Sequence, residues 1–197
     1  MDIQSCSLFL RNLHPVYLIM ERALRRASAA PGVRHVYRPE VFRADAIALD
    51  LEFLAGPGWT HSIPLLVESR EYGFRIAQVA ETNAALLVAH AYVRYLGDLN
   101  GGRALGRLIE QSLSLSSGSL AFYRFPAIQD GSCYIGSYRD ALCRAAEEIG
   151  DSRPVLDEAA EAFRLNIALS ECILRTWESS TSPARTGYDC LADDMLS

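Results

Sequence analysis

The sequence contains no lysine. All 19 of its basic residues are arginine, and 24 acidic residues outweigh them, which gives a net charge of −5. Proteins that bind nucleic acids usually present a basic face, so this balance argues against a nucleic-acid partner. It also means that recognition of a carboxylate by a cationic side chain must use arginine, whose guanidinium can bind both oxygens at once.

Long apolar runs are also missing. No segment approaches the roughly 20 consecutive apolar residues that a membrane-spanning helix needs, and the start, MDIQSCSLFLRNLHP, lacks the basic region and apolar core of a signal peptide. The five cysteines form no CxxC pair and no spacing typical of metal ligands. We therefore expect a cytoplasmic protein without membrane segments, whose thiols are reduced and packed in the core, and no metal site made by the protein alone.

What is present is helical periodicity. With 197 residues, half of them hydrophobic, the chain has the size and composition of one globular domain. Apolar residues at positions 9, 10, 13, 16, 17, 20 and 24 recur as on one face of a helix, which Pro15 should kink or leave irregular in its first turn. Turn residues separate the further segments. The predicted helices are 8–27, 39–55, 64–80, 84 to about 114, 132–149 and 154–178.

These ranges predict an all-α fold with one helical domain over residues 1–178. Either Thr82 or Asn83 can cap the fourth helix. The segment 114–130, rich in Ser and Gly, holds the only strand-like text, LAFYRF, and we interpret it as an ordered loop. Residues 179–197 have turn residues and acids but no period, so we expect a flexible tail.

Glycines interrupt the fourth helix at positions 97, 101, 102 and 106, within HAYVRYLGDLNGGRALG. Each glycine in a helix costs roughly 0.5–1 kcal/mol relative to alanine, so four of them need a reason. One reason is room for a flat ligand against the backbone, and the alternative is close packing between helices. Gly97 and Gly101 lie four apart and share a face. Asp98 stands beside them, one turn after Arg94, which is placed to pair with it.

The run YVRYLGDLNGG closely resembles the distal-helix signature of the heme oxygenase family, with Asn100 where that family usually has Ser. Four further blocks match the family in order, so that the resemblance runs from about residue 7 to residue 173. They are NLHPVYLIMERAL (12–24), ALDLEFLAGPGW (48–59), LAFYRFP (120–126) and AFRLNIAL (162–169), and AALLVAHAY directly precedes the signature.

The resemblance implies a multi-helical fold with a glycine-kinked distal helix. It also implies an enzyme that opens heme to biliverdin, releasing iron and carbon monoxide, with O₂ and with electrons from a ferredoxin, flavodoxin or reductase. A bilin-accepting phytochrome is a further partner that family habit suggests. Asp98 would organise water near the iron, with Tyr17 and Arg94 as its partners. Matching heme-contacting positions are Gly97, Gly101, Gly102, Tyr92, Arg139, Phe163 and Asn166.

Two positions depart from the family pattern. Arg139 is the candidate partner of a heme propionate, but Ile135 stands where the family often adds a lysine one turn earlier. The family ligates iron through a histidine on a helix upstream of the tyrosine that Tyr17 matches, and the sixteen residues before Tyr17 contain only His14. His90 resembles a family histidine that is not the axial ligand, so we expect a structural histidine there.

Three explanations of the absent first helix stay open. They are a start assigned too late, a shortened descendant, and a protein that uses another ligand. The absence also motivates a second functional reading, a non-catalytic heme-oxygenase-like protein that binds a tetrapyrrole or a partner without turnover. A third reading is a chain that exposes apolar surface and binds nothing.

Overall fold

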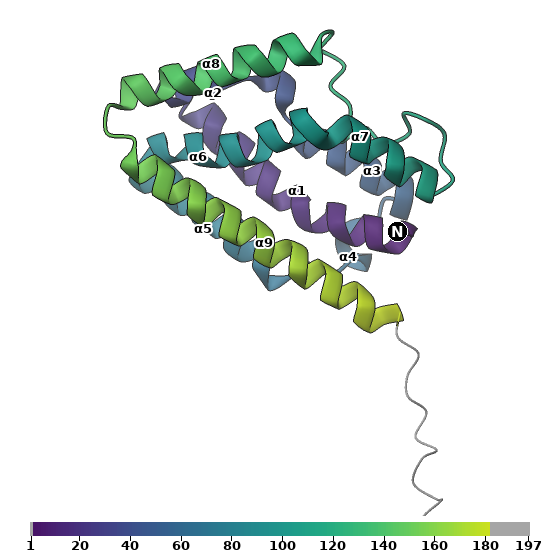
Figure 1. Ribbon diagram of the computed structural model, residues 1–197. Helices are drawn as coiled ribbons and strands as arrows, with labels where there is room; N and C mark the ends of the chain where they lie inside the picture. Colours follow the sequence, from purple (N-terminus) through teal and green to yellow (C-terminus); the bar gives the residue numbers. More distant parts are fainter. Residues whose placement is uncertain (1, 182–197) are drawn as a thin grey trace, which may run out of the picture.

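The computed structural model describes residues 2–181, and within them it is all helical and loop, as predicted. Figure 1 shows the arrangement: α1 runs through the middle, α5 and α9 lie side by side along one edge, and α8 lies along the opposite edge. The elements are α1 (Ile3–Arg26), α2 (Val33–Val36), η1 (Pro39–Val41), α3 (Ala44–Ala55), α4 (Trp59–Ser62), α5 (Val67–Thr82), η2 (Ala84–Leu86), α6 (Leu87–Ala91), η3 (Tyr92–Leu96), α7 (Gly97–Ser112), α8 (Gly131–Ile149) and α9 (Arg153–Thr181).

The central helix α1 carries the predicted apolar stripe into the core. Leu10, Val16, Met20 and Leu24 are fully buried on it, and it packs against α3, α5 and α9. The helix begins at Ile3 rather than at residue 8. Pro15 therefore lies in its interior, not in an irregular first turn, and helical geometry continues on both sides of it.

The second predicted helix, 39–55, is divided in two. A short 3₁₀ turn, η1, ends at Val41, and α3 begins only at Ala44. The buried carboxylate of Glu21, on α1, accepts hydrogen bonds from the backbone N–H groups of Arg43 and Ala44. Because a helix start leaves backbone donors free, this carboxylate from another helix fixes where α3 begins. Periodicity alone could not reveal that partner.

The glycine-rich helix begins as predicted, since the Asn83 side chain accepts a hydrogen bond from the backbone N–H of Ala85. From Ala84 to Ser112 the chain is helical without a break, through η2, α6, η3 and α7. The segment η3 is a π-helical turn, a rare widening of the helix that is frequent at functional sites. The irregularity thus precedes the first glycine of the signature rather than coinciding with the glycines.

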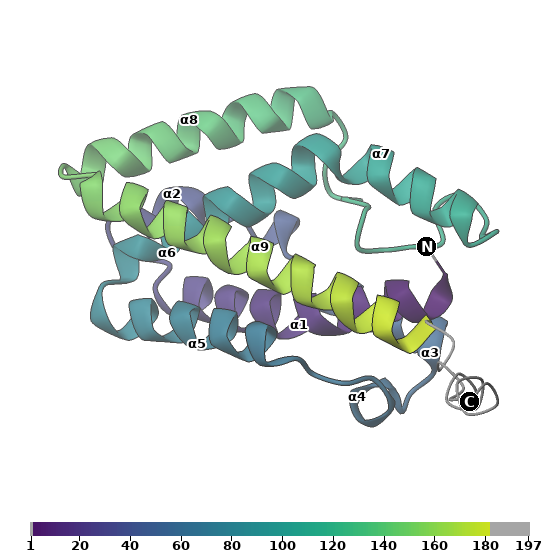
Figure 2. The ribbon, with the colours of Figure 1, turned by 60° about the horizontal axis from the view of Figure 1, so that its bottom comes forward.

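The remaining elements follow the prediction closely. Residues 113–130 form an ordered stretch of turns without a strand. The helix α8 ends at Gly150, whose positive φ of 78° suits a residue without Cβ. Figure 2 shows α9 crossing in front of α1. It continues to Thr181, beyond the predicted end at 178, and the rest of the expected tail lies outside the described residues. No helix in the described part is long and apolar enough to cross a bilayer.

Candidate functional site

A buried polar cluster joins α1 to the glycine-rich helix. The Tyr17 hydroxyl donates a hydrogen bond of 2.5 Å to Asp98 Oδ2, and it accepts hydrogen bonds from Arg94 Nε at 3.0 Å and Arg94 Nη2 at 2.7 Å. Arg94 Nη2 also lies 4.0 Å from Asp98 Oδ1, the expected pair one helical turn apart. The three residues predicted to act together are therefore in contact.

Asn166 completes the cluster from α9. Its side-chain oxygen accepts a hydrogen bond from Arg94 Nη1, and the Arg94 guanidinium lies 4.9 Å from the centre of the Tyr17 ring. Arg94 is thus held by groups from two other helices, and its charge is compensated by Asp98 within the same cluster.

Burial changes the proton affinity of these groups. Removal from water disfavours the carboxylate form and raises the pKa of Asp98, although Arg94 and the Tyr17 hydroxyl oppose the shift. Burial likewise raises the pKa of Tyr17 well above its usual range, so the phenol stays protonated and serves as a donor to Asp98. Asp98 is consequently an acid with a raised pKa, as is typical of groups that exchange protons in a reaction.

The four glycines of the signature face two different surroundings. An added Cβ on Gly97 or Gly101 would meet nothing within 4 Å, and both residues are exposed. An added Cβ on Gly106 would lie 2.6 Å from Tyr123 Cβ, so that glycine is required by packing. Gly102 is buried and faces the same tyrosine, at 4.0 Å from its Cδ1. Gly97 and Gly101 thus leave open space beside the helix, as a flat ligand would need, whereas Gly106 makes room for Tyr123.

Apolar side chains continue the open face of Gly97 and Gly101. Leu105 and Leu108 follow at helical spacing and are 47% and 64% exposed. Tyr92, the first residue of η3, meets Phe163 of α9 edge to face at 6.2 Å between ring centres, and both residues are more than one third exposed. Exposed apolar side chains of this kind are typical of binding surfaces.

Arg139 stands apart from this group. It is exposed on α8 and makes no hydrogen bond or ion pair with any described residue. Its guanidinium is therefore free to bind an anion, but the structure brings it into no contact with the other predicted site residues.

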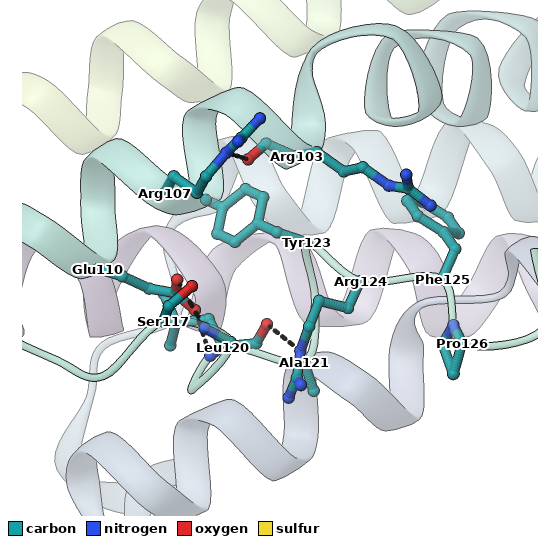
Figure 3. Close-up of a pocket in the computed structure, with 12 residues that line it drawn as sticks. Arg103, Arg107, Glu110, Ser117, Leu120, Ala121, Tyr123, Arg124, Phe125 and Pro126 are labelled. Carbon is teal, nitrogen blue, oxygen red and sulfur yellow. Dashed lines mark hydrogen bonds between the residues drawn. The ribbon is translucent and has the colours of Figure 1, made fainter. Parts of the chain in front are cut away.

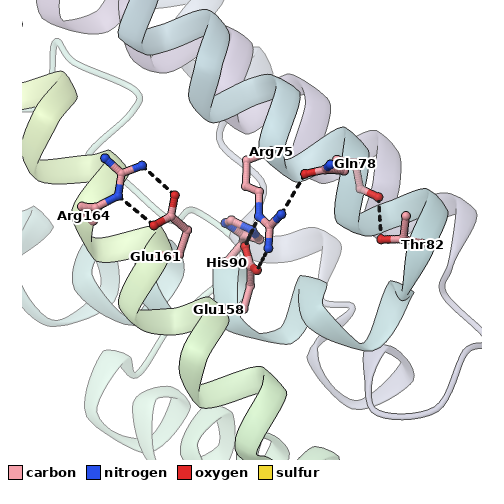
Figure 4. A network of polar contacts seen from close by, with 7 residues as sticks. All are labelled: Arg75, Gln78, Thr82, His90, Glu158, Glu161 and Arg164. Atoms are coloured by element: carbon pink, nitrogen blue, oxygen red, sulfur yellow. Dashed lines mark hydrogen bonds and ion pairs between the residues drawn. The ribbon is translucent and has the colours of Figure 1, made fainter.

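The histidines are engaged elsewhere. His90 is fully buried, and its Nε2 lies 3.0 Å from Glu158 Oε1, whose carboxylate also accepts from Arg75 (Figure 4). His14 packs on Trp59, and His35 pairs with Glu148. His61 hydrogen-bonds Thr60. No group of three or more metal-ligating side chains occurs among residues 2–181. His90 thus ties α6 to α9, as expected for a structural histidine.

Sequence reasoning missed a set of buried charges that holds the 113–130 loop. Asp50 on α3 accepts from the backbone N–H groups of Ala121 and Phe122 at 2.6 and 2.8 Å. Glu110 on α7 accepts from those of Gly118 and Leu120, both at 2.9 Å. Arg43 donates to the carbonyl of Phe122 at 3.4 Å and to that of Arg124.

We call these three side chains, Asp50, Glu110 and Arg43, the loop clamp. They hold the 113–130 loop in the position from which its aromatic residues contact Tyr17 and Gly106. Phe122 meets the Tyr17 ring edge to face at 5.7 Å, and Tyr123 fills the notch at Gly106. The only sequence signal was the presence of acidic residues on apolar helices, and their partners lie too far away in the sequence to be inferred.

The central helix thus combines an open glycine face with a partly buried acid, Asp98. A family model described as heme oxygenase matches residues 1–172, and the chain belongs to the heme oxygenase family. It is 35% identical over 158 residues to heme oxygenase 1 of Synechocystis sp., covering 80% of this chain and 66% of that protein. It is 38% identical over 167 residues to human heme oxygenase 1, covering 83% of this chain and 58% of that protein.

Solved structures agree with the fold. The heme oxygenase of Leptospira interrogans gives a TM-score of 0.79 at 33% identity, over 86% of this chain and 83% of that one. Heme oxygenase 1 of Synechocystis sp., solved in complex with heme, gives a TM-score of 0.81 at 30% identity, over 91% of this chain and 83% of that one. The chain spans less than two thirds of the length of the curated relatives named here, between 58% and 66%.

Proposed function

We propose that this protein is a heme oxygenase, which cleaves heme to biliverdin, iron and carbon monoxide with O₂ and an external source of electrons. The observation that carries the proposal is the open backbone at Gly97 and Gly101 directly beside the Asp98, Tyr17 and Arg94 cluster. A flat ring can approach the main chain there, next to an acid with a raised pKa.

The residues around this face fit one side of a heme. Gly97 and Gly101 would lie against the ring, and the exposed rings of Tyr92 and Phe163 would line it. Gly102, which the resemblance also assigns to the heme face, would lie buried beside Gly101. Arg139, with a free guanidinium, would bind a propionate. Bound heme would supply the iron at which O₂ reacts and the ring that is opened.

Asp98 would hold and deliver protons through water. Its Oδ2 is taken by the Tyr17 hydroxyl, whereas Oδ1 accepts no hydrogen bond from the described residues and lies 4.0 Å from Arg94 Nη2. Oδ1 is thus the atom at which a water molecule can be held. Asn166 and Tyr17 fix Arg94, which in turn limits how far the pKa of Asp98 rises. A positioned acid in a partly dry pocket contributes roughly 10²–10⁴-fold to a rate that depends on proton transfer.

The remaining partners are proposed from the family. We assign electron supply to a ferredoxin, flavodoxin or reductase, and we name a bilin-accepting phytochrome as a consumer of the product. We also propose a cytoplasmic setting, which the free thiols of Cys6, Cys133, Cys143 and Cys172 support.

A second candidate function rests on the histidines. Heme iron in proteins is commonly held by a histidine, cysteine, methionine or tyrosine side chain, and each histidine in the described part of the chain is engaged away from Gly97 and Gly101. This observation favours a protein that binds a tetrapyrrole at the glycine face without turning it over.

One experiment separates the two functions. The purified protein is mixed with hemin, NADPH, a ferredoxin with its reductase, and air, and the products are followed by absorption spectroscopy and carbon monoxide trapping. A heme oxygenase converts hemin to biliverdin with one carbon monoxide released for each ring opened. Hemin bound with a saturable spectral change but recovered intact supports the binding protein and contradicts turnover.

A further inference from the structure

A second concave site lies on the opposite face of the glycine-rich helix. Arg103, Gly106, Arg107 and Glu110 of α7 are spaced so that they share one side of the helix, away from Gly97 and Gly101. Together with eight residues of the loop between positions 117 and 126 they line a groove of about 600 Å³ (Figure 3). This volume falls within the range of about 300–1,000 Å³ that is typical of small-molecule sites.

Three guanidinium groups surround the groove. Figure 3 shows Arg103 and Arg107 on one side of the Tyr123 ring and Arg124 on the other. Arg103 Nη2 donates to the Ile128 carbonyl at 3.4 Å, Arg107 Nε to the Arg103 carbonyl at 3.2 Å, and Arg124 Nε to the Leu120 carbonyl at 3.2 Å. Because a guanidinium has five N–H donors, each side chain keeps donors free for a ligand.

The one carboxylate that lines the groove, Glu110, forms no ion pair with these arginines. Both oxygens of Glu110 accept hydrogen bonds from loop N–H groups, at Gly118 and Leu120. No carboxylate in residues 2–181 forms an ion pair with any of the three arginines. The groove is therefore lined by three guanidinium groups and one carboxylate, an excess of positive charge that favours an anionic ligand.

The base of the groove is apolar and rigid. Leu120, Tyr123 and Phe125 line it and are themselves buried below the surface, and the Arg43 guanidinium, fixed in the loop clamp, lies 4.1 Å from the centre of the Phe125 ring. The Tyr123 hydroxyl is buried without a hydrogen-bond partner among the described residues, and a polar group in that state calls for a water or a ligand atom.

We propose that this groove binds a small aromatic anion, with a flat ring over the apolar base and a carboxylate or phosphate held by Arg107 and Arg124. Carboxylate and phosphate groups each present two oxygens that can accept hydrogen bonds from the planar fork of an arginine side chain. The site lies on the face of α7 away from Gly97 and Gly101 and does not depend on heme turnover.

The test uses the whole protein without heme and four probes. They are 2-naphthyl phosphate, 2-naphthoate, neutral 2-naphthol and inorganic phosphate, with binding followed by calorimetry and, for the naphthalenes, by fluorescence anisotropy. We expect saturable binding of one or both aromatic anions, and affinity about tenfold or more weaker for the neutral ring and for inorganic phosphate. The stronger of the two aromatic anions identifies the acidic group that the site prefers.

Variants place the binding in the groove. Arg107→Gln with Arg124→Gln should weaken binding of the preferred anion about tenfold or more, and Ser117→Trp should weaken it by filling the groove without a change of charge. The matched control, Arg144→Gln with Arg153→Gln, alters two exposed arginines outside the groove and should leave affinity unchanged. Equal binding of 2-naphthol, no saturable binding of either anion, or unchanged affinity in both groove variants would overturn the proposal.

Discussion

The Tyr17 hydroxyl donates a hydrogen bond of 2.5 Å to Asp98 Oδ2, across 81 positions of the sequence. This contact fixes the orientation of the acid, because the same hydroxyl is held by two nitrogens of Arg94. One carboxylate oxygen is thus occupied, and the other is left for solvent or ligand. The proton chemistry proposed for the site depends on that division.

Replacing Asp98 by alanine should suppress ring opening. Without the carboxylate no group holds water at the open glycine face, so we expect the biliverdin yield per hemin to fall about 10²-fold, with a rise in peroxidase-like oxidation of guaiacol. The control Asp157→Ala removes an exposed acid of α9 and should have no effect on either yield. Unchanged biliverdin output from the Asp98 variant would remove this residue from its proposed role.

Glu21 should make stability depend on pH. Burial raises its pKa from 4.5 to about 7, despite hydrogen bonds from the backbone of Arg43 and Ala44 that favour the carboxylate. The folded protein therefore binds the proton more tightly than the unfolded chain does, and this contribution to the free energy of unfolding is full below pH 4.5 and is lost as pH rises through about 7. The loss amounts to roughly 3 kcal/mol.

Urea unfolding at pH 5 and pH 8 measures this dependence. The free energy of unfolding of the wild type should fall more between these two pH values than that of Glu21→Gln, which has no proton to lose. Parallel pH profiles for the two proteins would show that Glu21 titrates normally in the folded state.

Asp50→Asn should loosen the loop behind the cluster. An amide presents one acceptor and one donor group where Asp50 now offers two acceptors to the N–H groups of Ala121 and Phe122. We expect a loss of roughly 1–3 kcal/mol in unfolding free energy and faster proteolysis within residues 113–130. Asp45→Asn, at an exposed position of the same helix, is the control. Equal stability and equal cleavage in the two variants would refute the clamp.

Replacing His90 by alanine should lower the free energy of unfolding and leave the coordination of heme iron unchanged. The histidine is buried against Glu158, and its loss leaves a buried carboxylate with one partner fewer, at a cost of roughly 1–3 kcal/mol. The position of the Soret band after addition of hemin should match the wild type, as should that of the control His61→Ala on the surface. A shifted band in the His90 variant alone would make this histidine an iron ligand.

Helices could be predicted well from the sequence because their signals are local. The stripe on α1, the Asn83 cap and the Gly150 stop each depend on residues within a few positions of one another. The pairing of Arg94 with Asp98 could be predicted for the same reason, since both lie on one helix. The contact of Tyr17 with this pair followed only from the family resemblance, and the hydrogen bond from Arg94 to Asn166, a position expected to contact heme, was not predicted.

The features that could not be predicted from the sequence depend on contacts between segments that are distant in the chain. Asp50 lies 71 positions from Ala121 in the sequence, and Glu21 lies 22 positions from Arg43. Neither hydrogen bond can therefore be inferred from local periodicity. Gly106 is a glycine because of Tyr123, a residue of a loop whose path depends on those buried charges. The alternative interpretation of the glycines was close packing between helices, and at Gly106 the close neighbour is instead a loop residue.

The central claim is that the open backbone at Gly97 and Gly101 receives heme, and hemin titration of Gly101→Leu tests it most directly. The added side chain meets no protein atom near its Cβ, so the fold should persist by circular dichroism. The account predicts saturable, one-to-one hemin binding by the wild type and by the control Gly58→Leu, whose surroundings are equally open, and affinity about tenfold or more weaker in Gly101→Leu. Equal affinity in all three proteins would contradict it.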